Sequence, residues 1–218
     1  MNFNVLSLPG LKKFQEVQDL QLDLLEKRIA EQIPDTVILC EHFPTITRGR
    51  GLQSHDRPKP IGIMPEGTDY FEIQRGGDLT WHGPGQLVVY PIFKLKDRNV
   101  EAWIRLLENQ WVRVFEKLKI QAFSVPGGSG VWLKDAQGLE RKIGSVGIAL
   151  KRWVSFHGFA INIQNDLSAF QGFDPCGYAP SVMTNVKSLG TVSSALLSSD
   201  WREHWEKLIL AEMRADFP

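Results

Sequence analysis

The sequence predicts an α+β protein built on a mostly antiparallel or mixed sheet that is flanked by helices. Strand-like apolar runs follow one another through the middle of the chain, so they do not alternate with helices as in a parallel α/β fold. Amphipathic patterns of helical period occur near both ends and in the middle. A length of 218 residues suits one domain, and we expect residues 1–218 to form a single catalytic or binding domain.

Composition excludes several classes of protein. Lysine plus arginine and aspartate plus glutamate number 25 each, so the net charge is zero and nothing attracts the whole chain to nucleic acid or an anionic membrane. No apolar run approaches the roughly 18 residues of a membrane span, and residues 1–10 do not resemble a signal peptide. With only two cysteines, a disulfide framework is excluded and a cytoplasmic location is expected.

The first helix is expected at residues 11–33, where apolar side chains recur at helical spacing and Pro34 would end the helix. A short strand at 37–40 contains Cys40, which we interpret as a small buried hydrophobic residue. Residues 41–51 and 54–67 are expected to be loops. Arg48, Arg50, Arg57 and Lys59 could form a local basic patch or a solvated loop, and the sequence does not decide between them.

The rest of the chain reads as strands interrupted by one central helix. That helix, at 100–118, carries an aromatic and aliphatic stripe typical of a core-facing surface. A hairpin turn is expected at 135–138, and the runs 141–150 and 153–163 should be adjacent strands. Further elements are expected as strands at 69–73, 87–92, 122–125 and 131–133, a helical turn at 166–170, and a turn with a closing helix within 189–217.

A glycine-rich stretch at 74–86, between the strands at 69–73 and 87–92, is the strongest candidate for a binding loop. Glycines let backbone N–H groups approach a ligand, and a simple hairpin connection has no need of the Arg75, Trp81 and His82 side chains beside them. The stretch has neither the spacing of a phosphate-binding P-loop nor that of a dinucleotide fingerprint, and no metal-ligand signature occurs in the chain. We therefore expect no metal.

Cys176 is the candidate nucleophile, because it lies between Pro175 and Gly177 in an expected loop, outside any apolar run. A free thiol with a pKa of about 8.5 is mostly protonated at neutral pH, so a neighbouring cation or base must activate it. His82, His157 and Lys142 are available. The residues alone leave open whether Lys142 activates the thiol or reaches to solvent from the start of a strand.

A narrow apolar slot could form where two of the expected strands carry small residues. The six candidates lie in two short runs, Ser145, Val146 and Gly147 in one strand and Gly158, Phe159 and Ala160 in the next. Two core strands with small residues for packing would give the same pattern.

Several motifs together resemble the octanoyltransferases of lipoate synthesis. The blocks occur in the order of that family and cover roughly residues 37 to 190: Glu41-His42-x-Pro44, Thr47-x-Gly49-Arg50, Arg75-Gly76-Gly77-x-x-Thr80-x-His82-Gly83-Pro84-Gly85-Gln86, Arg141-Lys142-Ile143 with Gly147, His157-Gly158-x-Ala160-x-Asn162, Pro175-Cys176-Gly177, and Thr184 to Leu189. The resemblance implies a fold shared with biotin and lipoate protein ligases. It also implies transfer of an octanoyl group from acyl carrier protein to a lysine of a lipoyl domain.

Carried over by these motifs, Cys176 would accept the acyl group as a thioester, and Lys142 would lower the pKa of its thiol. The resemblance places the substrate pocket at Arg75, Gly76, Gly77, Asp78, Leu79, Thr80, Trp81, His82, Ser145, Val146, Gly147, Gly158, Phe159 and Ala160. Gly76, Gly77 and residues 144–147 would be candidate oxyanion donors. His82 would belong to the pocket.

The resemblance implies no cofactor beyond the phosphopantetheine of acyl carrier protein. Its expected partners are that carrier protein, the lipoyl domains of 2-oxoacid dehydrogenases and the glycine cleavage H protein, with no nucleic acid, no membrane and a monomeric chain. Two alternatives remain: an ATP-dependent lipoate or biotin protein ligase of the same fold, which would not need Cys176, and a non-catalytic lipoyl-domain-binding module.

Overall fold

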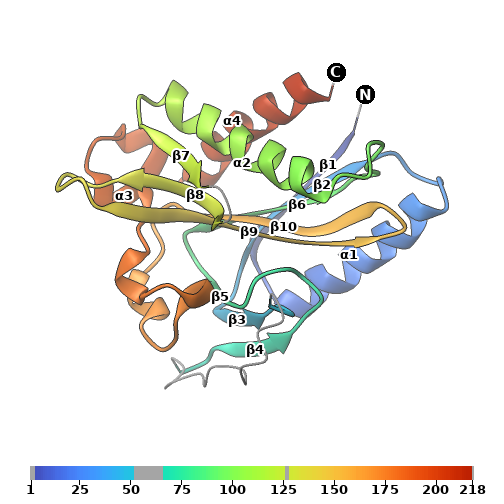
Figure 1. Cartoon of the computed structure of the whole chain (residues 1–218), viewed down its shortest axis with the longest axis horizontal. Helices are drawn as coiled ribbons and strands as arrows, with labels where there is room; N and C mark the ends of the chain where they lie inside the picture. Colours follow the sequence, from blue (N-terminus) through green and yellow to red (C-terminus); the bar gives the residue numbers. More distant parts are fainter. Residues whose placement is uncertain (1–2, 52–65, 126–127, 218) are drawn as a thin grey trace.

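A large mixed sheet organises the protein, and the structure, a computed structural model, describes residues 3–51, 66–125 and 128–217. The sheet order is β1-β2-β6-β10-β9-β8-β7, in which only β1 and β2 pair in parallel (Figure 1). Its strands are β1 (Asn4–Lys12), β2 (Thr36–His42), β6 (Gln86–Ile92), β7 (Ala122–Val125), β8 (Gly128–Lys134), β9 (Glu140–Lys151) and β10 (Val154–Asn162). The expected α+β class with a mostly antiparallel sheet is confirmed.

A small second sheet has the order β4-β3-β5 and lies below the large one in Figure 1. Its strands are β3 (Thr45–Arg48), β4 (Asp69–Glu72) and β5 (Leu79–His82). The central strand β3 pairs in parallel with β4 and antiparallel with β5, so Thr47 lies opposite Thr80. This pairing holds the glycine-rich stretch against the segment that precedes it.

Helices cover both faces of the large sheet. Helices α2 and α4 lie over one face and α1 over the other (Figure 1). The main core, on the α2 and α4 side, is dominated by aromatic residues such as Trp111, Phe115 and Trp205. The helices are α1 (Phe14–Ile29), α2 (Val100–Lys117), α3 (Val186–Leu189) and α4 (Trp201–Asp216), with short 3-10 turns η1 (Leu167–Phe170), η2 (Pro175–Gly177), η3 (Pro180–Val182) and η4 (Ser194–Leu197).

The first expected helix was placed wrongly at its start. Residues 4–12 form the edge strand β1, and α1 begins only at Phe14 and ends at Ile29, before Pro34. A register shift between Ser7 and Leu11 accommodates Pro9 and Gly10, which disguise this strand in the sequence.

Two short strands lie inside segments that were expected to be loops. β3 falls within 41–51, and β5 falls within the glycine-rich stretch 74–86. In β5, Leu79 and Trp81 point to one side and pack in a core with Phe170. Thr80 and His82 point to the other side, because successive strand residues face opposite ways. The expected loop at 54–67 lies almost wholly outside the described residues.

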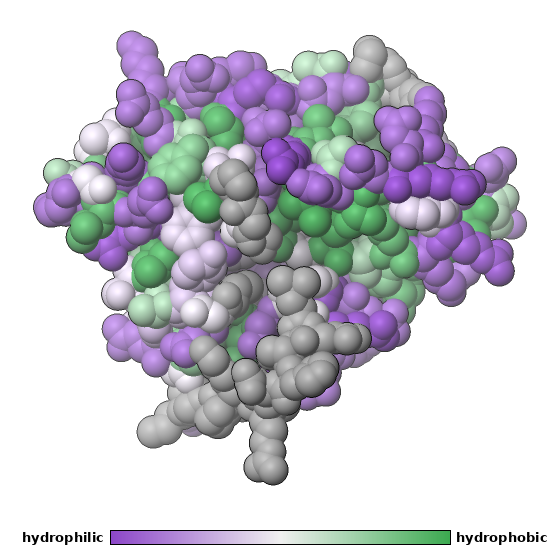
Figure 2. Space-filling model, viewed as in Figure 1, coloured by the Kyte–Doolittle hydropathy of each residue, from purple (hydrophilic) through white to green (hydrophobic). Residues whose placement is uncertain are grey.

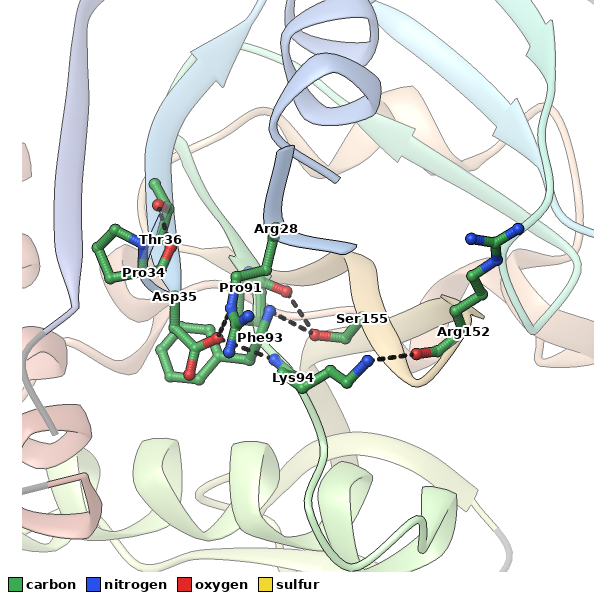
Figure 3. A network of polar contacts seen from close by, with 9 residues as sticks. All are labelled: Arg28, Pro34, Asp35, Thr36, Pro91, Phe93, Lys94, Arg152 and Ser155. Carbon is green, nitrogen blue, oxygen red and sulfur yellow. Dashed lines mark hydrogen bonds and ion pairs between the residues drawn. The ribbon is translucent and has the colours of Figure 1, made fainter. Parts of the chain in front are cut away.

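A polar network fixes the end of the sheet near the C-terminal end of α1 (Figure 3). Asp35 pairs with Arg28 of α1 at 2.6 Å and accepts the backbone N–H of Lys94. Pro91 has no N–H for the ladder, and next to it the Ser155 hydroxyl donates to the Pro91 carbonyl and accepts from the Phe93 N–H. Within the described residues, no helix is both long and apolar enough to cross a membrane.

Candidate active site

Arg75 ties the glycine-rich stretch together as a buried anchor. Its Nη2 donates to the carbonyl and the hydroxyl of Thr47, at 2.7 and 2.9 Å, and to the Asp78 carbonyl at 2.7 Å. The planar guanidinium can satisfy these diverging acceptors at once, which a lysine ammonium cannot do in the same geometry. Arg75 therefore fixes the loop against β3 and is 6% exposed.

The absence of a side chain at Gly147 allows this loop to lie directly on β9. The Gly76 N–H donates to the Ile148 carbonyl at 2.9 Å. A Cβ at Gly147 would lie 2.9 Å from the Gly76 carbonyl oxygen and 3.0 Å from Arg75 Cδ, so only glycine fits there. Because the Gly76 N–H is used in this contact, the expectation that it serves as an oxyanion donor is wrong.

A narrow cavity of about 30 Å³ lies between this loop, β6, β9, β10 and α1. All six expected slot residues line it: Ser145, Val146, Gly147, Gly158, Phe159 and Ala160. Arg75, Thr80 and His82 contribute from the glycine-rich stretch. The cavity lies on the α1 side of the sheet, where Phe14 stacks on His82 with ring centroids 6.2 Å apart.

The other expected pocket residues do not line this cavity. Leu79 and Trp81 face the small core on the opposite side of β5. Asp78 forms an ion pair with Arg48 at 3.6 Å, and its carbonyl accepts from the Gly49 N–H.

Figure 2, in the same orientation as Figure 1, shows a band of apolar surface over the β9–β10 region, bordered above by the hydrophilic surface of α2.

A chain of hydrogen bonds connects His82 to the strand that carries Lys142. The His82 Nδ1 lies 2.8 Å from Gln86 Oε1, and Gln86 Nε2 donates to Asn162 Oδ1 at 2.9 Å. Asn162 in turn donates to the Thr184 carbonyl, and the Thr184 N–H donates to the Lys142 carbonyl. Since an amide oxygen only accepts, His82 carries its proton on Nδ1, which leaves Nε2 as an acceptor.

The histidines of this region are held neutral. Burial lowers the pKa of His82 to about 3, with His42 as a second cause, and burial lowers the pKa of His157 to about 3. Burial likewise lowers the pKa of His42 to about 4. A neutral histidine can accept or donate a hydrogen bond in the slot, but it cannot serve as the cation that stabilises a thiolate at neutral pH.

Lys142 is the cationic side chain that the structure buries next to the η2 segment. It is 1% exposed, and its Nζ lies 5.4 Å from the centre of the Trp132 ring and 5.3 Å from that of Tyr178. Its backbone bridges to Met183. Lys142 therefore does not reach to solvent, so this alternative, which the sequence left open, is excluded.

The candidate nucleophile, Cys176, is placed near the site by the backbone of η2. Cys176 lies in this short 3-10 turn, which packs near β5, and Tyr178 follows it directly. The Tyr178 ring packs edge-on against Trp132, with centroids 5.0 Å apart, and both rings face the Lys142 ammonium. The structure thus places the segment that contains Cys176 near Lys142, although the two residues are 34 positions apart in the sequence.

Sequence reasoning missed several residues of the site. Phe14, Ile73, Val88 and Tyr90 line the cavity, and only the folded arrangement reveals them. Glu108 is a different case, because a carboxylate within the apolar stripe of α2 was a visible signal. It is 4% exposed and accepts the Gly130 N–H at 2.7 Å. Cys40 is confirmed as a buried hydrophobic residue, and burial strongly raises the pKa of its thiol.

The fold is that of the lipoate protein ligases. The structure superposes on lipoate-protein ligase A bound with ATP with a TM-score of 0.67, at 13% identity, covering 97% of this chain and 84% of the other. The bipartite lipoate protein ligase from Thermoplasma acidophilum gives a TM-score of 0.64 at 13% identity, with coverage of 97% and 81%. This confirms the expected fold.

The chain belongs to the lipoyl protein ligase A/B catalytic domain family, whose model matches residues 13–201. Among its curated relatives, an octanoyltransferase of Thermobifida fusca is 42% identical over 177 residues, covering 79% of this chain and 73% of the relative. An octanoyltransferase of an Arthrobacter species is 34% identical, with 96% of each chain covered.

Proposed function

We propose that this protein transfers an octanoyl group from a thioester donor to a lysine of a lipoyl domain, with Cys176 as the acyl carrier. The chain is an acyltransferase of the octanoyltransferase kind, as its curated relatives are. The mechanism rests on one observation: the Lys142 ammonium is buried against the segment that contains Cys176.

In the first half-reaction, the Cys176 thiolate attacks the carbonyl carbon of the donor thioester. A new C–S bond forms, the bond to the donor sulfur breaks, and the released thiolate takes a proton from Lys142. A thioester is exchanged for a thioester, so the step is nearly balanced and needs no ATP. The Lys142 ammonium favours the thiolate because opposite charges stabilise each other in a site of low dielectric.

In the second half-reaction, the neutral amine of the target lysine attacks the Cys176 thioester. The C–S bond breaks, an amide forms, and the amine proton passes to Lys142, which is neutral after the first half-reaction. The thiolate and the ammonium are thereby restored. An amide is more stable than a thioester, and this difference drives the transfer forward.

The narrow cavity is the proposed position of the acyl chain, and at about 30 Å³ it must open further to admit eight carbons. It is lined by small residues on the surface of the paired strands β9 and β10, and by Phe14 and Tyr90 from the facing elements. Each buried methylene contributes about 0.8 kcal/mol, so the slot distinguishes chains by length. The neutral His82 lines the same slot and orients it; it is not assigned a proton in the chemistry.

The donor is proposed to be octanoyl-acyl carrier protein, so the only cofactor is the phosphopantetheine arm of that partner. Acceptors are proposed to be lipoyl domains, including those of 2-oxoacid dehydrogenases and the glycine cleavage H protein. The T. acidophilum ligase was solved in a study that includes its E2 lipoyl domain, which supports a lipoyl domain as the acceptor class. We further propose a cytoplasmic, monomeric protein that consists of one catalytic domain.

The alternative is an ATP-dependent lipoate ligase, since the same fold serves that reaction in other proteins. The identity favours the transferase, because the curated octanoyltransferases are 34–42% identical to this chain and the ligase structures 12–14%.

The two reactions are distinguished by their donors. Purified protein is mixed with apo lipoyl domain and either octanoyl-acyl carrier protein without ATP, or free lipoate with ATP. We expect octanoylation only in the first mixture, with loss of activity in Cys176→Ser. Modification only in the second mixture, retained in Cys176→Ser, would establish the ligase.

A further inference from the structure

We propose that Glu108 is a positioning residue for Lys142: its carboxylate fixes the backbone on which the lysine side chain rests, and its charge favours the ammonium form. This inference rests on the proposed function. Glu108 belongs to α2, which covers the opposite face of the sheet from the acyl slot, and it reaches the beginning of β8, the strand next to the edge strand β7.

The first link is a hydrogen bond from the strand to the helix. The Gly130 N–H donates to Glu108 Oε1 at 2.7 Å, a short bond of the kind that an ionised acceptor makes. Glu108 is 4% exposed, although a glutamate on a surface helix has no difficulty reaching water. A buried carboxylate is costly unless it is hydrogen-bonded and near a positive charge.

The second link is the close packing of Gly130 on Lys142. A Cβ at Gly130 would lie 3.0 Å from Lys142 Cε and 2.1 Å from the Gly144 carbonyl oxygen. Gly130 also has a φ of 121°, which L side chains rarely adopt. The glycine is therefore required on both steric and conformational grounds, and it holds the backbone of β8 against the methylenes of the catalytic lysine.

The third link is electrostatic. The ammonium of Lys142 acts on Glu108 through space and lowers the pKa of its carboxyl, against the larger effect of burial, which raises it. The attraction is mutual, so an ionised Glu108 favours the protonated form of Lys142. Arg105 also acts on Glu108 from the same helix.

The groups that face Lys142 leave Glu108 as its negative neighbour on the helix side. β8 contributes Trp132, the segment after η2 contributes Tyr178, and the bridge to Lys142 comes from Met183. The faces of these rings attract a cation. Glu108 is thus a carboxylate that interacts electrostatically with Lys142.

Glu108→Gln isolates the charge, because the amide oxygen can still accept the Gly130 N–H. We would label the full-length protein with ¹³Cε-lysine, identify Lys142 by the resonance lost in Lys142→Met, and follow its titration by NMR. Glu108→Gln should lower the Lys142 midpoint by on the order of one pH unit. The alkaline limb of the octanoyl-transfer profile should move down in pH by the same amount.

Two further variants complete the test. Glu108→Asp keeps the charge and should shift the midpoint less than Glu108→Gln does. Glu116→Gln removes an exposed carboxylate of the same helix, and the Lys142 midpoint in this variant should match that of the wild type. An unchanged Lys142 midpoint in folded Glu108→Gln would overturn the assignment.

The NMR readout separates this inference from the proposed function. If the wild type forms no acyl-enzyme but the Lys142 midpoint still shifts in Glu108→Gln, the transfer mechanism fails and the coupling of Glu108 to Lys142 holds. If the wild type transfers octanoyl groups and the midpoint does not move, the transfer mechanism holds and Glu108 is only structural.

Discussion

The Nζ of Lys142 lies 5.3 Å from the centre of the Tyr178 ring, and Tyr178 follows Cys176 by two residues. An aromatic side chain two residues after the proposed nucleophile thus contacts the proposed base. A ring face attracts an ammonium through its quadrupole, so it favours a charged lysine without neutralising that charge. Tyr178 accordingly helps to hold the lysine that we propose activates the thiol.

Replacement of Tyr178 by leucine should therefore slow octanoyl transfer. Loss of a partly buried cation–π contact of about 1 kcal/mol corresponds to roughly a fivefold lower rate at neutral pH. Tyr178→Phe keeps the ring and serves as the matched control, with a rate close to that of the wild type. Equal rates for Tyr178→Leu and Tyr178→Phe would show that the ring contact does not matter for the reaction.

Gly147 is the position in the slot where a single methyl group should be harmful. Its added Cβ would meet the Gly76 carbonyl oxygen at 2.9 Å and Arg75 Cδ at 3.0 Å, so the glycine-rich stretch must move away from β9. Overpacking of this kind costs about 1–3 kcal/mol. Gly147→Ala should lower both the melting temperature and the transfer rate.

Gly76→Ala is the matched control for that substitution, since its Cβ would meet only the Ile148 carbonyl oxygen, at 3.8 Å. Thermal unfolding and initial rates measured side by side decide the matter. If Gly76→Ala is as damaging as Gly147→Ala, the close approach at Gly147 is not the cause.

The buried histidines predict a stability that falls in mild acid. The folded pKa of His82 is about 3, below its ordinary value of 6.5, so between these values the unfolded chain binds a proton that the folded chain does not. The contribution is complete above pH 6.5 and is lost as the pH falls toward 3, with a slope of about 1.4 kcal/mol per pH unit.

His82→Gln should therefore reduce the pH dependence of the unfolding free energy between pH 6 and about pH 4. His204→Gln removes an exposed histidine of α4 and should leave that dependence unchanged. Denaturant unfolding at several pH values measures both slopes. Identical slopes for the wild type and His82→Gln would contradict the neutral, buried state of His82.

The turn between β9 and β10 predicts a stabilising substitution. Arg152 and Trp153 have φ values of 48° and 64°, the left-handed conformations of a two-residue hairpin turn, which favours asparagine and glycine. Arg152 is exposed, and its carbonyl accepts a hydrogen bond from the Lys94 side chain (Figure 3). Arg152→Asn should raise the unfolding free energy by about 0.5–1 kcal/mol, whereas Arg152→Val should lower it.

Much of the fold was predictable from sequence because its strongest patterns are local. The stripe of apolar residues that includes Trp103, Trp111 and Phe115 has a helical period, and α2 agrees with the expected helix to within a residue. The β9–β10 hairpin followed from strand propensity and turn position. β1 was missed because Pro9 and Gly10 interrupt it, and its pairing with β2 is a tertiary contact that no local pattern reveals.

The candidate site was predictable where chemistry requires a residue type, and not where packing decides. Small residues such as Gly147 and Ala160 identified the slot, because small side chains leave room over the surface of the sheet. The strand alternation in β5 then separated Thr80 and His82 from Leu79 and Trp81, which a loop prediction treats alike. The approach of Glu108 to Gly130 depends on how α2 packs on the sheet, so it could not be predicted from the position of Glu108 in the apolar stripe alone.

The covalent acyl-enzyme is the central claim, and intact mass tests it most directly. Purified protein is mixed with octanoyl-acyl carrier protein in the absence of ATP and its mass is measured. We predict a gain of one octanoyl group that hydroxylamine removes, that is absent in Cys176→Ala, and that apo lipoyl domain discharges. No gain in mass in the wild type, under conditions in which the lipoyl domain becomes octanoylated, would contradict the thioester mechanism.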